Sequence, residues 1–433
     1  MSSYTDVNTE GPNTPGVEEQ SETIVQEQTL SIPSIFPFMF MADETYRKPH
    51  NCPLRTLITA RQTIVEQEDV QNGLTDIQGI SWRNGPVGKE AYRNFRESIR
   101  PASTFISYHR SNELQETREE LDYEGNEFYR FRYTDTNIHC SYRHPQLRNL
   151  ICATSKNDIY YLFNNAVQHW CPQLRTAKTI LGYPLKSPYA RVPEKITTMA
   201  AMDNLLLAGG EDGCFTFINL ETCSSPVFDR FTNGDNMEVN GIEMSYSRTG
   251  KIHAFVSTND LQVRCMDMST LETYATYPTD WFVNYTTQSP DGHMIALVGD
   301  DEEGQVMSVN SREKIATLRG HQRYSFSAAW SPDSMMLATG SDDFSTCIYD
   351  TRMMSNPLHI LGKGITQSIR SLRYSACGRY LVMAEDRNLV HIVDTTSDYS
   401  KAQKIGFVGD ISGISLTPDG EGLFIGVSYV DFS

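Results

Sequence analysis

The chain has 433 residues, a formal net charge of −17 and a pI near 5.0, and this acidity argues against nucleic acid as a partner, because binding a polyanion requires clustered Lys and Arg. No secretory leader opens the sequence, and no apolar run approaches the roughly 18 residues that cross a bilayer. We therefore expect a protein of the cytoplasm or nucleus that has no membrane partner, and its 39% hydrophobic content suffices for a large core.

Residues 1–75 are predicted to be an acidic disordered tail. Residues 1–30 contain six acidic residues and no Lys or Arg, so they cannot bury enough apolar surface to offset the entropy lost on ordering. Residues 31–41 (SIPSIFPFMFM) form a short apolar run interrupted by two prolines. This run could pack against the globular body, dock as a linear motif in a partner's groove, or anchor weakly at a membrane surface.

Residues 76–125 are predicted to be a helical and extended lead-in. The stretch DIQGISW (76–82) suggests a short extended segment, and KEAYRNFRESIR (89–100) predicts a helix that ends before Pro101. Tyr92, Phe95 and Ile99 share one face of this helix, which indicates packing on the main domain. Residues 110–127 are acidic and polar, which is typical of a solvated connector.

Residues 126–433 contain a repeat. The segments that begin at 246, 288, 330, 374 and 416 align, and their marker residues Ser247, Ser289, Ser331, Ser375 and Thr417 are 42, 42, 44 and 42 residues apart. Each unit combines short apolar strands with a Pro-Asp-Gly type of turn, in which Pro presets φ and Gly accepts a positive φ. Four short strands in about 42 residues are typical of one blade of a β-propeller.

Two more degenerate units precede these five. Residues 195–221 fit the repeat directly, and residues 137–163 fit if 164–194 are treated as an insertion. The count predicts an all-β, seven-bladed propeller with a mostly disordered, partly helical N-terminal extension. We expect residues 128–134 (FYRFRYT) to pair with the last blade, so that no sheet edge stays exposed.

The unit at 320–352 resembles the WD40 repeat, since it begins with Gly320-His321 and ends with Tyr349-Asp350 where Trp-Asp is usual. The resemblance implies a buried hydrogen-bond network of His321, Ser341 (or Thr339), Asp343 and Tyr349 that ties the strands of the blade together. The alternative interpretation is a Ser-His-Asp catalytic set. No strained G-x-S-x-G turn accompanies these residues, so the structural interpretation is favoured.

No catalytic, cofactor-binding or metal site is predicted. Acidic residues recur at one tight turn in six units, which indicates that they serve the repeat rather than an active site; they are Asp158, Asp212, Asp260, Asp301, Asp343 and Asp386. Phosphate-binding glycine loops and H-E-x-x-H motifs are absent. An enzyme with carboxylates on a propeller face remains the alternative from another functional class.

The stretch LATGSDDFSTCIYDTR (337–352) resembles the box that marks WD40 substrate receptors of cullin-4 type ubiquitin ligases. Tyr349, Asp350 and Arg352 stand at its defining positions, although Tyr replaces the usual Trp and Thr346 stands where an aliphatic residue is common. The resemblance implies that Arg352, with Asp350, contacts a ligase adaptor. The structural alternative is an Arg that lies along the edge of a blade.

DIQGISW (76–82) and longer stretches at 144–162, 368–394 and 409–427 resemble a functionally uncharacterised family of fungal and plant WD-repeat proteins. Members of that family continue past the last apolar strand, whereas here only six residues follow Val427. We therefore expect the last blade either to be completed by other segments or to be deficient. The function predicted is a non-enzymatic scaffold for protein partners, monomeric on its own.

Overall fold

The computed structural model describes residues 64–84, 88–99, 117–142, 144, 146–182, 195–222, 225–231 and 237–428. Residues 1–63 of the predicted tail, including the apolar run 31–41, lie outside these residues. The last part of that tail carries strand β1 (Ile64–Glu66) and helix α2 (Gln67–Gln71) instead of a disordered segment. No helix in the described part of the chain has the length and apolarity needed to cross a bilayer.

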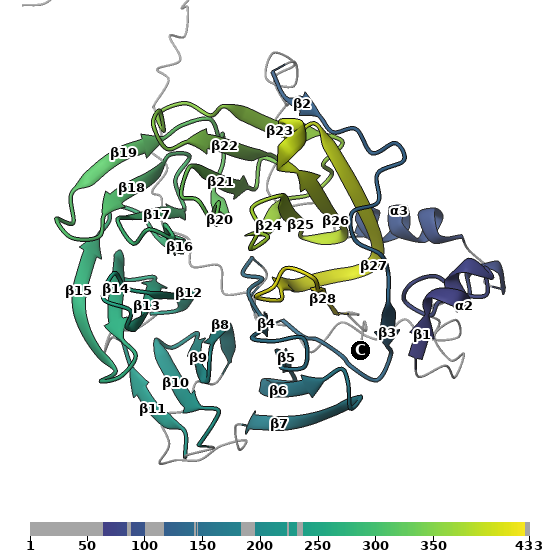
Figure 1. The fold of residues 1–433 in the computed structure, drawn as a ribbon, viewed down its shortest axis with the longest axis horizontal. Coiled ribbons are helices and arrows are strands. Elements are labelled where there is room, and N and C mark those ends of the chain that lie inside the picture. Colours follow the sequence, from purple (N-terminus) through teal and green to yellow (C-terminus); the bar gives the residue numbers. More distant parts are fainter. Residues whose placement is uncertain are drawn as a thin grey trace, which may run out of the picture. The chain divides into compact units, whose positions relative to one another are not determined.

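Six four-stranded antiparallel sheets follow one another around a ring in chain order (Figure 1). The first sheet contains β4 (Ile151–Ala153), β5 (Ile159–Phe163), β6 (Ala166–Cys171) and β7 (Thr176–Gly182). The second contains β8 (Ile196–Met202), β9 (Leu205–Gly210), β10 (Cys214–Asn219) and β11 (Val227–Arg230). The third contains β12 (Val239–Tyr246), β13 (Ile252–Thr258), β14 (Gln262–Asp267) and β15 (Glu272–Pro278).

The remaining three sheets continue the same order. The fourth contains β16 (Val283–Gln288), β17 (Met294–Gly299), β18 (Gly304–Ser308) and β19 (Lys314–Leu318). The fifth contains β20 (Ser325–Trp330), β21 (Met336–Ser341), β22 (Thr346–Asp350) and β23 (His359–Lys363). The sixth contains β24 (Ile369–Tyr374), β25 (Tyr380–Glu385), β26 (Arg387–Asp394) and the first half of β27 (Lys401–Leu416), with the short helix η2 (Thr395–Ser397) before β27.

The next sector of the ring is formed differently. The second half of β27 leaves the sixth sheet and pairs with β28 (Leu423–Ser428), from Asp410 opposite Ser428 to Leu416 opposite Leu423. Strand β27 contacts both β24 and β4, and the amide of Leu150, just before β4, donates to the carbonyl of Ser412 in β27 at 3.2 Å. The ring therefore closes between its last and first sheets. The structure thus has six four-stranded blades and a seventh sector in which two described strands pair.

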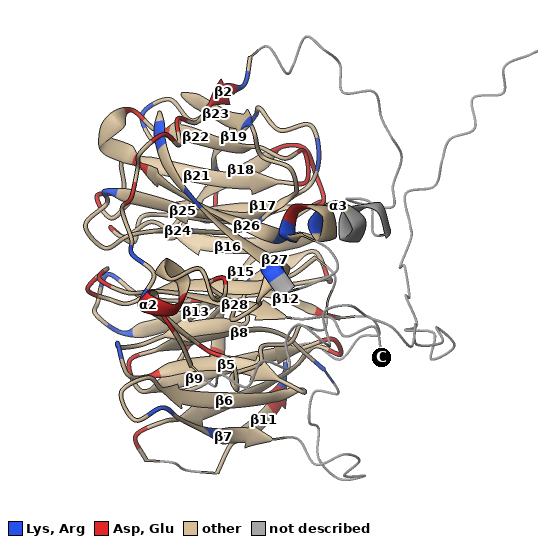
Figure 2. Ribbon diagram, turned by 90° about the vertical axis from the view of Figure 1, so that its right-hand side faces the viewer, with Lys and Arg blue, Asp and Glu red and all other residues tan. Residues whose placement is uncertain are grey.

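The core lies between neighbouring sheets, because the middle strands are apolar on both faces. One cluster joins the fourth and fifth sheets through Tyr285, Val306, Leu337 and Tyr349, all almost fully buried. Trp330 belongs to the same cluster, and its Nε1 donates to the carbonyl of Thr287 at 3.1 Å, so the polar atom of this buried ring also finds a partner in the next sheet. In the side view of Figure 2, charged residues lie mostly on the loops at the two ends of the strands.

The turns that close the inner hairpins follow the predicted chemistry. In the fourth sheet, the hydroxyl of Ser289 donates to Asp291 at 2.6 Å, and the same carboxylate accepts from the backbone of His293 at 3.0 Å. Gly292 has φ +73°, a conformation that favours Gly. The Ser-Pro-Asp-Gly pattern of the repeat therefore correctly predicted the geometry of this turn.

Two sequence-based expectations were wrong within the propeller and its edge. Residues 164–194 are not simply an insertion, since they contain β6 and β7, the outer strands of the first sheet. Of residues 128–134, only 133 and 134 enter a strand, β3 (Tyr133–Asp135), and it pairs with β1 rather than with the last blade. The backbone amides of Phe128 and Tyr129 donate to the side chain of Gln403, so they do not pair with the backbone of another strand.

The lead-in also differs from its prediction. DIQGISW forms a turn and not an extended segment, because the carboxylate of Asp76 accepts from the amides of Gln78 and Ile80 and from the indole of Trp82. The short helix η1 (Trp82–Asn84) follows it, and the predicted helix is present as α3 (Lys89–Ile99). Residues 117–127 are not merely a solvated connector.

The described part of that connector joins the ring. Strand β2 (Glu119–Glu120) adds to the outer edge of the fifth sheet, parallel to β23. Leu121, which is 3% exposed, enters the core cluster of the fifth and sixth sheets. The N-terminal lead-in is thus bound to the outside of the ring at several points.

Candidate functional site

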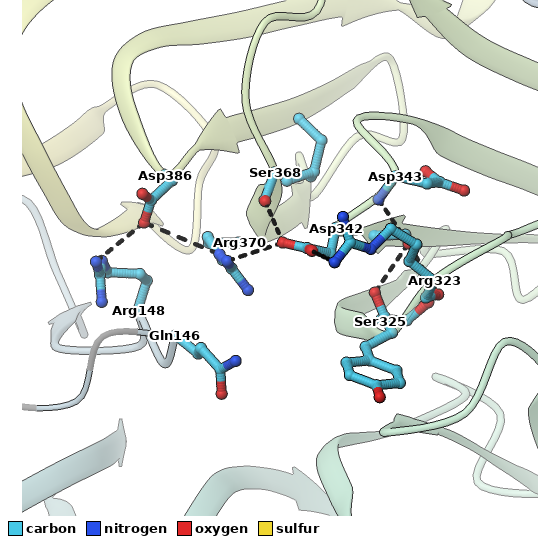
Figure 3. A network of polar contacts seen from close by, with 12 residues as sticks. Gln146, Arg148, Arg323, Ser325, Asp342, Asp343, Ser368, Arg370 and Asp386 are labelled. Carbon is cyan, nitrogen blue, oxygen red and sulfur yellow. Dashed lines mark hydrogen bonds and ion pairs between the residues drawn. The ribbon is translucent and has the colours of Figure 1, made fainter. Parts of the chain in front are cut away.

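We call the end of the ring at which the innermost strands begin the top face, and the other end the bottom face. Five charged residues meet at the top face, and we call them the charged belt; they are Arg148, Arg323, Asp342, Arg370 and Asp386 (Figure 3). The chain brings them together because the loops before the first strands and the turns after the second strands lie at the same end of each sheet.

The charged belt is a chain of ion pairs. Arg148 Nη2 lies 3.0 Å from Asp386 Oδ1, and Arg370 Nε lies 3.9 Å from the same oxygen. Arg370 Nη2 in turn lies 3.1 Å from Asp342 Oδ1, and Arg323 Nη2 lies 3.3 Å from Asp342 Oδ2. Because Arg148 precedes the first sheet, the belt connects the fifth and sixth sheets to the first across the two-stranded sector.

Most of the belt is buried. The side chains of Arg148, Asp342 and Arg370 are 3%, 7% and 8% exposed, whereas Arg323 is 37% exposed. The guanidinium of Arg370 also stacks on the ring of Phe326 at 3.8 Å. A buried guanidinium needs such neighbours, because taking a charge out of water is costly unless it is paired.

The electrostatics of the belt favour its ionised form. Burial alone raises the pKa of Asp386, but the guanidiniums of Arg148, Arg370 and Arg387 outweigh burial, and the pKa is lowered overall. Counted over its five residues, the belt has three cations and two carboxylates, and Arg387, whose Nη2 lies 3.3 Å from Asp386 Oδ2, adds a further cation beside it. Nε of Arg148 and both Nε and Nη1 of Arg370 have no hydrogen-bond partner in the described structure.

The sequence did not single out the belt as a site. The second residue of the innermost strand is Thr197, Asn240 or Asn284 in three other sheets, whereas Arg370 occupies this position in the sixth and Arg148 the corresponding position before β4. A comparison of the repeats at this position could have found the two arginines. Nothing in the repeat indicates that they share Asp386.

The predicted blade network lies in the fifth sheet. His321 Nδ1 is 3.1 Å from Asp343 Oδ2, and His321 Nε2 is 2.8 Å from the hydroxyl of Thr339. Ser345, which the sequence did not indicate, donates to the other oxygen of Asp343 at 2.5 Å. The residue that contacts the imidazole is therefore Thr339, which the sequence offered as the alternative to Ser341.

Ser341 and Tyr349 lie beside this triplet and bind backbone groups. Ser341 donates to the carbonyl of Tyr324 at 2.8 Å and accepts from the amide of Asp343. The hydroxyl of Tyr349 donates to the carbonyl of Arg319 at 3.0 Å. These contacts join the loop before β20 to the hairpin of β21 and β22.

The network is too deeply buried to act as a hydrolytic triad. In such triads the nucleophile and the acid contact opposite nitrogens of the imidazole. Here the hydroxyl of Thr339 and the carboxylate of Asp343 do contact opposite nitrogens of His321, but Thr339 is only 1% exposed, so its hydroxyl is closed to a substrate. Ser345 is fully buried and lies 3.3 Å from Nδ1, the nitrogen that already faces Asp343. Among the described residues, no group of three or more His, Cys, Asp and Glu side chains could hold a metal ion.

The electrostatics of His321 and Asp343 are coupled. Burial raises the pKa of Asp343, but His321 and the hydroxyl of Ser345 lower it by more, so the pKa lies below its usual range. Burial lowers the pKa of His321, whereas Cys347 and Asp343 raise it, and the net pKa is raised. A protonated imidazole beside an ionised carboxylate is the favoured state of this pair.

Asp350 and Arg352 lie on the bottom face, away from the charged belt. The side chain of Arg352 is 74% exposed, and its Nε donates to Asp350 at 2.9 Å. Hydrogen bonds from the Arg352 side chain and backbone lower the pKa of Asp350 to about 2. The guanidinium thus projects into solvent but is held against its neighbour.

Two comparisons with known proteins match parts of the chain. Residues 312–350 match the family described as WD domain, G-beta repeat. A 107-residue stretch is 33% identical to "Cell division cycle 20.1, cofactor of APC complex" from Arabidopsis thaliana, which covers 24% of this chain and 23% of that protein. The matched repeat covers β19 of the fourth sheet and β20 to β22 of the fifth, and together with the ring of four-stranded sheets it supports an all-β propeller of the WD40 type.

Proposed function

We propose that the chain is a non-enzymatic scaffold for protein partners and that an acidic segment of a partner docks on the top face at the charged belt. The observation that carries this proposal is the excess positive charge of the belt in a protein of net charge −17. A carboxylate approaching the exposed part of Arg323 would complete the chain of ion pairs. Complementary charge of this kind provides specificity and a fast encounter.

Exposed aromatic residues support the same surface. Tyr324 is 46% exposed and Phe282 is 44% exposed, and each directly precedes an innermost strand on the top face. Aromatic residues and Arg are enriched at the positions that dominate the energy of protein interfaces. Arg323 and Tyr324 are therefore the two residues on which we expect docking to depend most.

The test is an affinity purification of the full-length protein from its own cells, with partners identified and compared between variants. The double variant Arg323→Glu/Tyr324→Ser is expected to lose a specific set of partners, and Arg352→Ala, on the other face, to keep them. The thermal stability of both variants is measured in parallel. Retention of every partner by the double variant, when it is folded, would contradict the proposal.

A second candidate function is that of a substrate receptor whose bottom face binds a cullin-4 type ligase adaptor. The specific observation in its favour is the exposure of Arg352 in the motif YDTR, with Asp350 fixing its orientation. The partial similarity to a protein named as a cofactor of the APC complex is compatible with a subunit of a larger assembly. Recovery of the adaptor with the wild type but not with Arg352→Ala supports this candidate function. Absence of the adaptor from both purifications contradicts it.

We also propose that the ring is seven-bladed and that residues 133–140 complete the seventh blade. Tyr133, Ile138 and Cys140 pack in a cluster with Phe424 of β28 and Trp170 of the first sheet. A Cβ on Gly426 would lie 3.2 Å from the sulfur of Cys140, so this segment runs directly beside β28. Deletion of residues 64–142 should then lower the melting temperature, and an unchanged value argues against a seventh blade completed in this way.

The predicted location in the cytoplasm or nucleus and the closer relation to fungal and plant WD-repeat proteins remain proposals. So does the role of His321, Ser341, Asp343 and Tyr349 as a network that stabilises one blade; the hydrogen bonds described above support it.

A further inference from the structure

A pocket of about 400 Å³ lies on the bottom face between the third and fourth sheets. The turn from β12 to β13 forms one wall and the turn from β18 to β19 forms the other. Both turns lie at the end of the ring opposite the charged belt, because the innermost strands end there.

The side chains at the pocket are mainly basic. Arg248, Lys251 and Arg312 line it, and Asp267 is the one carboxylate among its lining residues. Lys251 Nζ lies 3.8 Å from Asp267, and neither arginine forms an ion pair with another described residue. The carboxylate of Asp267 also accepts from the amide of Ser269 at 2.8 Å. The pocket thus has an excess of two positive charges.

Comparison with the other sheets shows that the turn between β12 and β13 does not need the positive charge of the pocket in order to form. The equivalent position in three sister hairpins is acidic and accepts a hydrogen bond from the preceding Ser or Thr; these residues are Asp291, Asp333 and Asp419. The third sheet has Thr249 there, which lies 2.9 Å from the hydroxyl of Ser247. The backbone of the turn still closes, from the amide of Gly250 to the carbonyl of Ser247 at 2.8 Å.

The geometry of the two sheets places the basic groups together. Arg248 runs across the neighbouring hairpin at Gly292, where a Cβ would lie 2.7 Å from Arg248 Cγ. Since Gly292 also has φ +73°, a larger residue there would strain the turn and displace the arginine. Arg312 comes from the next turn of the same sheet, so the two guanidiniums approach the pocket from neighbouring loops.

The floor of the pocket is polar and neutral. His253 is 2% exposed, and its Nδ1 lies 2.7 Å from the hydroxyl of Tyr274. Its Nε2 lies 3.1 Å from the hydroxyl of Ser245 and also contacts the side chain of Gln288. Tyr274 is 52% exposed and forms an aromatic side of the pocket. The floor is already hydrogen-bonded, so the exposed cations are the groups left to bind an anion.

We propose that this pocket binds the phosphoryl group of a phosphorylated serine or threonine in a partner protein. A phosphoserine carries about −1.5 to −2 charges at neutral pH and three acceptor oxygens, which matches the excess charge and the donors of Arg248, Lys251 and Arg312. A phosphorylated lipid headgroup presents similar oxygens. The net charge of −17 opposes approach to an anionic membrane surface, so the soluble segment is the favoured source.

The test uses the full-length protein and a fluorescent peptide library with a fixed central phosphoserine, titrated by fluorescence polarisation at physiological salt. The same library with unmodified serine is the chemical control, and inorganic phosphate is the competitor. Lys251→Glu and Arg312→Glu each reverse one charge of the pocket. Arg379→Glu is a matched control, since it occupies the position of Lys251 in the sixth sheet and lies 3.6 Å from the equivalent carboxylate, Asp394.

We expect the phosphorylated library to bind more tightly than the unmodified one, and Lys251→Glu and Arg312→Glu to weaken its binding about tenfold or more, because a charge-assisted hydrogen bond is lost and a repulsion is added. Arg379→Glu should bind as the wild type does. Equal binding of the two libraries overturns the proposal. An equal loss of binding in Arg379→Glu also overturns it, because it indicates general charge attraction. A protein that binds vesicles containing phosphatidylinositol phosphates but not the phosphorylated peptides overturns it as well. The double variant of the top face is expected to bind the phosphorylated library normally, so the two proposals fail or succeed separately.

Discussion

Asp386→Asn is the substitution that most directly tests the charged belt. It removes a negative charge from between Arg148 and Arg370 with almost no change in volume, and it leaves two buried guanidiniums near each other. Removing one partner of a buried ion pair costs about 3–5 kcal/mol. Arg148 still donates to the carbonyl of His144 at 2.6 Å, so we expect the lower end of that range, about 3 kcal/mol.

The assay is urea denaturation at neutral pH, followed by intrinsic fluorescence. The matched control is Glu303→Gln, which breaks an arginine pair with Arg319 whose side chains are 48% and 60% exposed. An exposed pair of this kind contributes about 0–1 kcal/mol. Added salt should not restore the stability of Asp386→Asn, because a buried pair is poorly screened.

The pH dependence of the same variant has a defined sign. The pKa of Asp386 is lowered in the folded protein, so its contribution is complete above the unfolded value near 3.9 and is lost as the pH falls through the folded pKa. The difference between wild type and Asp386→Asn should therefore be constant near neutral pH and shrink below about pH 4. A loss no larger than that of Glu303→Gln at pH 7 would refute the reasoning that the belt is a buried, mutually dependent set of charges.

Three further outcomes are expected. Gly299→Ala should lower the free energy of unfolding by about 1–3 kcal/mol, since the added Cβ would overlap the carbonyl oxygen of Phe282; equal urea midpoints contradict this. Gln78→Ala should speed hydrogen exchange in residues 64–84 while β12–β19 stay protected, because two buried hydrogen bonds to β27 are lost; unchanged exchange shows that other contacts suffice. In Asp343→Asn, NMR titration of His321 should give a lower pKa than in the wild type, since the carboxylate that helps to raise it is lost while burial persists. The stability that the wild type loses as the pH rises through the raised pKa of His321 should then be smaller in the variant, and an unchanged pKa contradicts this.

The repeat made the propeller readable from sequence, because each sheet is specified by contacts within about 42 residues. The turn from Ser289 to His293 forms as its Ser-Pro-Asp-Gly pattern predicts, and the spacing then locates the strands on both sides. The outer strands of the first sheet were missed for a physical reason. Strand β7 is exposed along most of its length, so it lacks the apolar alternation that identifies a strand.

Contacts between distant segments could not be predicted. Arg148 and Asp386 are 238 residues apart, and neither their residue types nor their spacing indicates that they meet. The prediction for the lead-in was also wrong. DIQGISW has the apolar pattern of a strand, but the side chain of Asp76 accepts hydrogen bonds from the backbone amides of this stretch and folds it into a turn. The sequence identified His321 and Asp343 as neighbours because they occupy fixed repeat positions, and it missed Ser345 because that position has no such role in the pattern used.

The length of β27 has a consequence for the order in which the protein folds during synthesis. This strand gives its first half to the sixth sheet and its second half to the next sector, and Gln78, 330 residues earlier in the chain, binds its backbone at Val408. The lead-in therefore stays without its docking site until the ribosome has released residues beyond 416. Until then the first sheet also lacks a neighbour on one side, and its inner strand β4 is exposed to other nascent chains. Ring closure is a late, long-range step, which is the class of step that is slow and most exposed to aggregation.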